Sequence, residues 1–385
     1  MVDTSFSGDP GPGQADLGVS AKTPALSLIL CSRNDNYMGD SRWRLQTALN
    51  FVAKNVEDIG RASDIEVVVS DWGSSAPLRE VLDLCPAAAR LTSFVHVPPA
   101  LAAELQRDSP FAEVIALNAA ARRSTGQFIG RIDQDTLVGT RFLRTFFACL
   151  DGTLPIPEPL MMGFSNVKYV NYRFTACCPS PSSVEYFVRW FGPWLKKENW
   201  RSKSPFYEAA VGIWLLRRDV WNECGGYDER MIYMNAMETN MSRRLLTKYP
   251  MVDLGEMCNY DFYHLEHYNP WSVRKTSTHR KVNPNLPFAE PDAINPNGAT
   301  WGLSDTRLVV APARRQDFGP GGRPGFPGFL MFAGRVTYIL PTVLFDTLGL
   351  AARKWLLRSR RVRSIVHGRP VTDWPRLVLT RWKER

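Results

Sequence analysis

From residue 26 onward the chain alternates between short apolar runs and segments of helical periodicity, and this alternation constrains the fold more than any other feature. The apolar runs lie at 26–32, 65–70, 93–97 and 127–132, and the helical segments between them include 41–55 and 111–123. Strands separated by helices are typical of a parallel sheet with helices on its faces. The sequence therefore predicts an α/β fold, a Rossmann-like and mostly parallel sheet flanked by helices.

The two ends of the chain differ in composition from this central part. Residues 1–24 are rich in Gly, Pro, Ser and Asp, so we expect them to be disordered. They lack the basic start and long apolar core of a signal peptide. From Asn283 to Gly328 Pro and Gly accumulate, which predicts a long irregular connection.

The net charge of +9 is concentrated in the C-terminal tail. From Arg353 to Arg385 eleven Lys and Arg residues stand against Asp373 and Glu384, a balance of +9, so residues 1–352 are close to neutral. The basic pI therefore belongs to a tail and not to a nucleic-acid-binding body, and we expect no nucleic-acid partner.

Residues 329–385 form an apolar and then basic extension, predicted to be helical. Its longest uncharged span, Val336 to Phe345, has ten residues, against the roughly 20 that cross a bilayer. An apolar segment followed by RSRRVR favours a peripheral anchor at an anionic membrane surface. The alternative is a pair of helices packed on the main domain.

The seven cysteines show no C-x-x-C spacing, so they predict neither a disulfide framework nor a zinc site. Free thiols fit a reducing compartment. We therefore expect a cytoplasmic protein, with possible attachment to the inner face of a membrane through its tail.

Polar residues follow three of the predicted strands: Ser32 to Asp35, Asp71 to Ser75, and Asp133 to Asp135. The carboxyl ends of parallel strands share one edge of the sheet, where ligands bind in open α/β folds. Two carboxylates there suit Mg²⁺ or Mn²⁺ holding a diphosphate. The plainer alternative is a solvated turn, since Asp is common where strands end.

These runs resemble a known family. NAAARRSTGQFIGRIDQDT (118–136) is similar to the segment before the donor site of family 2 glycosyltransferases of the GT-A fold, and SLILCSRND and EVVVSDWGSS resemble their first two strand-loop units. The segment 211–245 is similar to their acceptor side and to the C-terminal region of galactosyltransferases. The resemblance covers roughly residues 26 to 270.

The resemblance implies a role for each matching residue. Asp71 would bind the base of a nucleotide, Asp133 and Asp135 would form the D-x-D metal site, and Glu238 would be the catalytic base. The match is imperfect, because the family's E-D-x-D reads here as Met237 to Asn240. Either the acceptor pocket is rebuilt around Glu238 or the base lies elsewhere. The nucleotide-binding residues expected are Ser32, Asn34, Asp71, Arg131 and Asp133.

Glu238 is also a plausible base on chemical grounds. Inverting transfer needs a carboxylate within hydrogen-bond reach of the acceptor hydroxyl. The alternative is an ion-paired surface carboxylate, although Met241 and Ser242, at i+3 and i+4, offer it no basic partner.

His264 and His267 are two of the five histidines in the chain. Resemblance to some GT-A enzymes makes His264 a third metal ligand, and imidazole beside carboxylates favours Mn²⁺ over Mg²⁺. A structural histidine at a strand is the alternative. We assign His267 to the acceptor or sugar, together with Trp190 and Trp194, whose indoles can stack on sugar rings. An aromatic cluster of this kind can equally belong to the core.

The sequence thus predicts an inverting, metal-dependent, family 2-like hexosyltransferase of polysaccharide biosynthesis. Residues 25–282 would form the catalytic domain, with its nucleotide-sugar half ending near residue 150 and its acceptor half following. The donor would be a nucleotide-diphosphate sugar, and the acceptor a glycan, a lipid-linked or a small molecule. The alternatives are an inactive nucleotide-sugar-binding protein, or a membrane or nucleic-acid adaptor that uses the basic tail.

Overall fold

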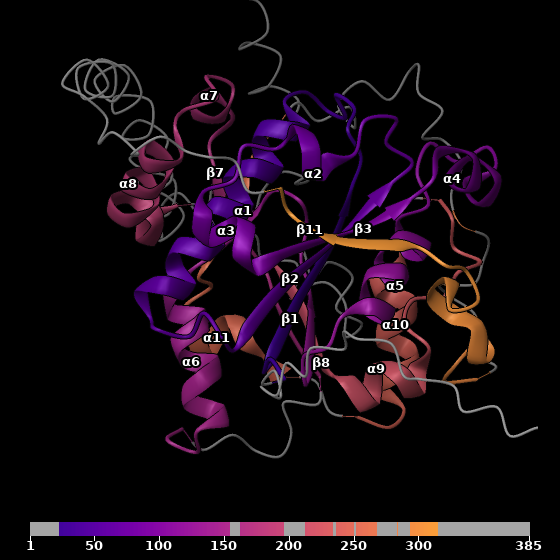
Figure 1. Cartoon of the computed structure of the whole chain (residues 1–385). Coiled ribbons are helices and arrows are strands. Elements are labelled where there is room, and N and C mark those ends of the chain that lie inside the picture. Colours follow the sequence, from indigo (N-terminus) through magenta and orange to yellow (C-terminus); the bar gives the residue numbers. More distant parts are fainter. Residues whose placement is uncertain are drawn as a thin grey trace, which may run out of the picture.

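The computed structural model describes residues 23–154, 162–195, 212–233, 236–249, 252–267, 283 and 293–314. Its centre is a sheet of eight strands within these ranges (Figure 1). In spatial order they are β11 (Val309–Pro312), β3 (Thr92–Val97), β2 (Ile65–Trp72), β1 (Leu26–Ser32), β4 (Phe128–Arg131), β8 (Ile213–Arg217), β6 (Met162–Ser165) and β9 (Val252–Asp253). Neighbours from β3 to β4 are parallel, whereas β8 runs antiparallel to β4 and β6. The predicted α/β fold with a mostly parallel sheet is confirmed.

Helices cover both faces of the sheet because its strands are apolar on both sides. Leu28 and Leu30 of β1 pack into one core, and Ile29 between them points into the other. The first core is covered by α1 (Ser41–Asp58), α3 (Pro86–Leu91) and α6 (Thr140–Leu150). The second is covered by α4 (Pro99–Gln106), α5 (Glu113–Arg123), α9 (Arg218–Cys224) and α10 (Met237–Leu246), three of which, α5, α9 and α10, lie together on one side of the sheet in Figure 1.

A second, three-stranded sheet lies against α1. It consists of β5 (Thr136–Val138), β10 (Phe262–Leu265) and β7 (Lys168–Val170), in the order β5-β10-β7. A third apolar cluster joins it to α7 (Tyr172–Thr175) and α8 (Pro181–Phe191) through buried residues such as Phe174 and Phe187. This sheet brings the region around residue 264 next to the end of β4.

The segment expected to be an irregular connection contributes to the fold where it is described. The 3-10 helix η4 (Gly298–Leu303) packs against α5, with Trp301 2% exposed in the second core. Val309–Pro312 pairs antiparallel with β3 as the edge strand β11. The Pro and Gly content gave no indication of this strand, because an edge strand with exposed side chains carries little apolar signal.

The remaining elements are short: α2 (Leu78–Val81), η1 (Gly192–Trp194) and α11 (Leu254–Cys258). No helix among the described residues is long and apolar enough to cross a bilayer. The N-terminal segment 1–22 and the extension 329–385 lie outside the described residues, so disorder of the former and membrane contact of the latter stay predictions.

Candidate functional site

The three polar strand ends meet at one edge of the central sheet. The parallel register places Ser32 opposite Asp71. Ser32 Oγ donates to Oε1 of Gln134, at 2.5 Å, and the backbone N–H of Asn34 donates to Ser74 Oγ, at 2.7 Å. The loops after β1, β2 and β4 therefore form one continuous surface, as the parallel arrangement predicts.

Asp71 is fully buried at this edge, with one oxygen satisfied and one free. Its Oδ2 accepts from the amide of Leu78 at 2.9 Å and lies 3.2 Å from Nδ1 of His96. Its Oδ1 has no hydrogen-bond partner among the described residues. A buried acceptor without a partner is costly, so this oxygen is suited to a donor from a ligand, such as an N–H of a base.

Asp135 lies in a cluster of nitrogen ligands on the side of the second sheet. It forms a buried ion pair with Arg44, and its two oxygens lie 3.1 Å from His264 Nδ1 and 3.5 Å from His267 Nε2. The ligand atoms of Asp135, His264 and His267 all lie within 4.8 Å of one another. We call these residues, with Arg44, the Asp135 cluster.

Strand pairing explains how residues so far apart in the chain meet. β5 begins directly after Asp135 and pairs antiparallel with β10, which places His264 opposite Thr136. The amide of Leu265 also donates to the carbonyl of Asp135, at 3.0 Å. His264 is therefore positioned by backbone register and not by a helical face, and His267 follows two residues beyond the end of β10.

The charges of the cluster favour the ionised carboxylate. Burial acts to raise the pKa of Asp135, but His264, Arg44 and His267 together hold it well below its ordinary value. Burial acts to lower the pKa of His264, but the attraction of Asp135 and Asp133 together raises it above its ordinary value. One carboxylate and two imidazoles in such proximity are a donor set that suits a transition-metal ion such as Mn²⁺ better than Mg²⁺.

Asp133 belongs to a different group of charges, centred on Arg131. Arg131 is 3% exposed, and its guanidinium lies 2.7 Å from both Glu113 and Asp133, and 3.5 Å from Glu238. We call these four residues the Arg131 cluster. It joins β4, α5 and α10, so the predicted base and the first aspartate share one buried cation.

In the Arg131 cluster carboxylates outnumber cations, whereas around Asp135 one carboxylate faces an arginine and two imidazoles. Burial raises the pKa of Asp133 to about 6 against the attraction of Arg131, and Asp135 and Glu113 raise it further. Burial likewise raises the pKa of Glu238 to about 7. One guanidinium faces three carboxylates, so a proton near neutral pH is favourable on Glu238. A carboxylate with a pKa near 7 is suited to general-base catalysis.

Two polar contacts hold the Gly-Gly turn after α9 against α5 and against the last turn of α10, the helix that carries Glu238. Asn118 of α5 donates to the carbonyl of Tyr227 at 2.8 Å and accepts from its amide at 2.9 Å. Arg244 is buried and donates to the carbonyls of Cys224 and Gly226, at 2.9 and 2.7 Å. Gly226 has a φ of +70°, and a Cβ there would lie 2.2 Å from Asn118 Oδ1. The Gly-Gly turn is thus required for this close approach.

The structure groups the predicted site residues differently from the sequence. Asp135 and His264 come together as expected for metal ligands. Asp133 forms an ion pair with Arg131 and lies outside this group of ligands. His267, which the sequence analysis assigned to the acceptor, belongs to the Asp135 cluster. Arg131, assigned to the nucleotide, is paired with carboxylates.

Trp190 and Trp194 lie on the outer surface of the α8 and η1 region, with exposed fractions of 69% and 74%. The buried face of α8 is formed by Val184, Phe187 and Val188 instead. The alternative that the two indoles belong to the core therefore does not hold.

Sequence reasoning missed Arg44 and Glu113. A signal for Arg44 was present, because it falls in the helical stripe that contains Leu45, Leu49 and Val52, and a charged residue on the buried face of a helix needs a partner. Glu113 stands in the first turn of α5, a common place for an acid, and nothing in its pattern distinguishes it.

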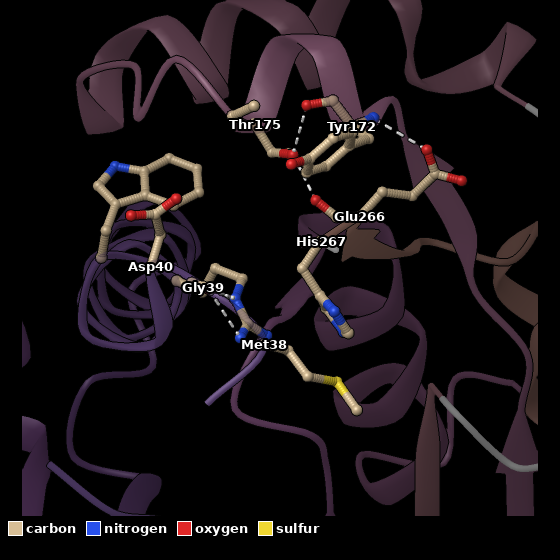
Figure 2. Close-up of a pocket in the computed structure, with 10 residues that line it drawn as sticks. Met38, Gly39, Asp40, Tyr172, Thr175, Glu266 and His267 are labelled. Atoms are coloured by element: carbon tan, nitrogen blue, oxygen red, sulfur yellow. Dashed lines mark hydrogen bonds between the residues drawn. The ribbon is translucent and has the colours of Figure 1, made fainter. Parts of the chain in front are cut away.

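A pocket opens beside the Asp135 cluster, with about 260 Å³ of space that includes its open mouth. Both Arg44 and His267 line it. Figure 2 shows Gly39 and Asp40 on one side of this pocket and Tyr172 and Glu266 on the other, with His267 facing into it. Two members of the cluster thus line a pocket that opens to solvent.

Comparison with known proteins finds similarity only among solved structures. No family model and no curated protein matches the chain. Staphylococcus aureus TarS matches with a TM-score of 0.40 and 14% identity over 63% of this chain and 36% of TarS, so the match spans about a third of that protein. A structure of TarS residues 1 to 349 with UDP-GlcNAc has a TM-score of 0.38 and 14% identity over 66% of this chain and 61% of that one.

The catalytic domain of Drosophila β1,4-galactosyltransferase 7, in complex with xylobiose, matches with a TM-score of 0.39 and 11% identity. It covers 71% of this chain and 83% of that one. A mutant of the same enzyme, in complex with manganese, UDP-Gal and xylobiose, has a TM-score of 0.38. At these scores and identities the similarity assigns neither an activity nor a substrate to this chain.

Proposed function

We propose that the chain is an inverting, metal-dependent glycosyltransferase that moves a hexose from a nucleotide-diphosphate sugar to an acceptor hydroxyl. The proposal rests on the different surroundings of Asp133 and Asp135. Asp135 lies among potential cation ligands, while Asp133 is linked through Arg131 to Glu238, a buried carboxylate with a pKa of about 7. The proposed cation site at Asp135 and the proposed base Glu238 are thus linked through Arg131, at the end of β4, and Asp133.

Each part has a chemical task in this proposal. Asp135, His264 and His267 would hold Mn²⁺, with Mg²⁺ the less suited ion. The ion would supply Lewis-acid stabilisation of the leaving diphosphate. The free Oδ1 of Asp71 would accept a hydrogen bond from the base of the nucleotide, and Ser32 and Asn34 would line the same edge.

Glu238 would take the proton of the acceptor hydroxyl. Arg131 would orient it, since the guanidinium contacts both Asp133 and Glu238 and is itself buried. Attack from the side opposite the leaving diphosphate inverts the anomeric centre. A glycan, a lipid-linked sugar or a small molecule could supply the hydroxyl, and Trp190 and Trp194 are exposed and available for an extended acceptor.

The test is transfer from UDP-GlcNAc and UDP-Gal, the nucleotide sugars of the two structures described above, measured as release of UDP with Mn²⁺ present. We expect Asp135→Ala and Glu238→Gln each to lower turnover by about 100-fold or more. Glu238→Gln should leave UDP binding unchanged, and Glu80→Gln, an exposed acid on α2, should have no effect. Full activity in both site variants would refute the assignment. Nucleotide binding that depends on Mn²⁺, without transfer, would favour a binding protein instead.

Membrane contact through residues 329–385 remains part of the proposal and is tested separately. We expect the full chain to float with vesicles that contain anionic lipids, and a chain ending at residue 328 to stay behind. Equal behaviour of the two would contradict an anchor in this segment.

A further inference from the structure

We propose that Arg44 is a positioning residue that keeps one oxygen of Asp135 occupied, and so limits the affinity of the site for a free divalent cation. The inference rests on the cation site of the proposed function. It concerns Arg44, to which the sequence predictions gave no role in the site.

All three nitrogens of the Arg44 guanidinium donate hydrogen bonds. The side chain is 2% exposed, and one terminal nitrogen forms the ion pair with Oδ2 of Asp135. The other terminal nitrogen donates to the carbonyls of Tyr37 at 2.6 Å and Gly39 at 3.2 Å, and Nε donates to Gly39 at 3.3 Å. The planar, fixed donors of arginine suit such a position, and they leave the group little freedom to move away from Asp135.

The backbone before α1 is shaped to receive this guanidinium. Met38, Gly39 and Asp40 have φ values of 56°, 75° and 51°, three consecutive residues in the left-handed region. A non-glycine residue in this region is strained and persists only when other contacts compensate. The turn directs two carbonyls at Arg44, so the contact with Asp135 is supported by a dedicated loop.

The charge count gives the consequence. Histidines that bind a metal are neutral, so in a site ready for a cation Asp135 contributes one negative charge and Arg44 one positive charge. The neutral side chains of His264 and His267 add no charge. A divalent ion bound to the same carboxylate is repelled by the neighbouring guanidinium, in a buried site where screening is weak. Removing the charge of Arg44 should therefore tighten cation binding.

The test is calorimetric titration of the full-length protein with Mn²⁺ alone. We expect Arg44→Gln, whose amide can still donate to the carbonyls of Tyr37 and Gly39, to bind Mn²⁺ at least tenfold more tightly than the unmodified protein. Arg44→Lys keeps the charge and should stay within about threefold. Arg42→Gln is the matched control, because Arg42 lies on the same helix, is exposed, and should leave binding unchanged.

A second measurement covers loss of folding in the variant. If Arg44→Gln is less stable without metal, the melting temperature should rise more on addition of Mn²⁺ than it does in the unmodified protein. Equal or weaker Mn²⁺ affinity of Arg44→Gln, together with an equal or smaller rise in melting temperature, would overturn the inference. Transfer activity of the unmodified protein decides the proposed function independently, so the two can fail separately.

Discussion

The Asp135 cluster and the Arg131 cluster each combine a buried arginine with one of the two aspartates that follow β4, yet the pKa values of these aspartates differ. Asp135 meets Arg44 and two imidazoles, and its pKa falls. Asp133 shares Arg131 with two further carboxylates, and its pKa rises to about 6. The difference is one of charge balance, because the Asp133 side chain is the more exposed of the two, 25% against 5%, and still has the higher pKa. Two residues apart in sequence, one carboxylate is kept ionised and the other is set close to neutral pH.

The comparison predicts unequal costs of removing the two arginines. Arg131→Met leaves three carboxylates around an uncompensated site and should lower the free energy of unfolding by about 3–5 kcal/mol. Arg44→Met should cost about 1–3 kcal/mol, because protonated His264 or His267 can replace part of the lost charge. Urea unfolding at pH 7 measures both. Equal losses of stability in Arg131→Met and Arg44→Met would contradict the difference between the clusters. As the control, Arg42→Met should change stability by less than about 0.5 kcal/mol.

Cation binding should depend on one cluster only. His264→Ala should weaken Mn²⁺ binding by about 100-fold, and His267→Ala by about tenfold because its nitrogen lies farther from Asp135. Calorimetry measures both values. Glu113→Gln, in the other cluster, is the control, and an effect on Mn²⁺ binding as large as that of His264→Ala would show that the two clusters act as a single site.

Glu238 should destabilise the folded protein at alkaline pH. Its pKa of about 7 lies above the ordinary value of 4.5, so the folded state favours the protonated form. Stability from this group is therefore full below about pH 4.5 and declines as the pH rises through 7. At pH 8 Glu238→Gln should be more stable than the unmodified protein by about 1–3 kcal/mol, and near pH 4.5 the difference should vanish. A difference independent of pH would contradict the raised pKa.

The rate of transfer should show the same ionisation. A general base acts in its deprotonated form, so kcat/KM should fall about tenfold per pH unit below pH 7 and level off above it. Steady-state assays between pH 5.5 and 8.5 would measure this. If kcat/KM of Glu238→Gln still falls tenfold per pH unit below pH 7, the ionisation belongs to another group.

Much of the scaffold follows from local patterns in the chain. The apolar runs predicted the strands β1 to β4, and helical periodicity predicted α1 and α5 to within a few residues. The position of β11 did not follow, because pairing at a sheet edge depends on the neighbour available and not on the apolar content of the segment. The antiparallel direction of β8 likewise depends on how the chain returns to the sheet.

By itself, the sequence determined that Asp71, Asp133 and Asp135 stand at one edge of an α/β sheet, because strand and helix periods are local properties of the chain. Only the tertiary structure decided which charges each acid meets. Arg44 reaches Asp135 from a helix 91 residues away, and Glu238 reaches Arg131 from another. His264 arrives through the register of β10 on β5. Protonation and ligand geometry depend on these long-range contacts, and no spacing in the sequence specifies them.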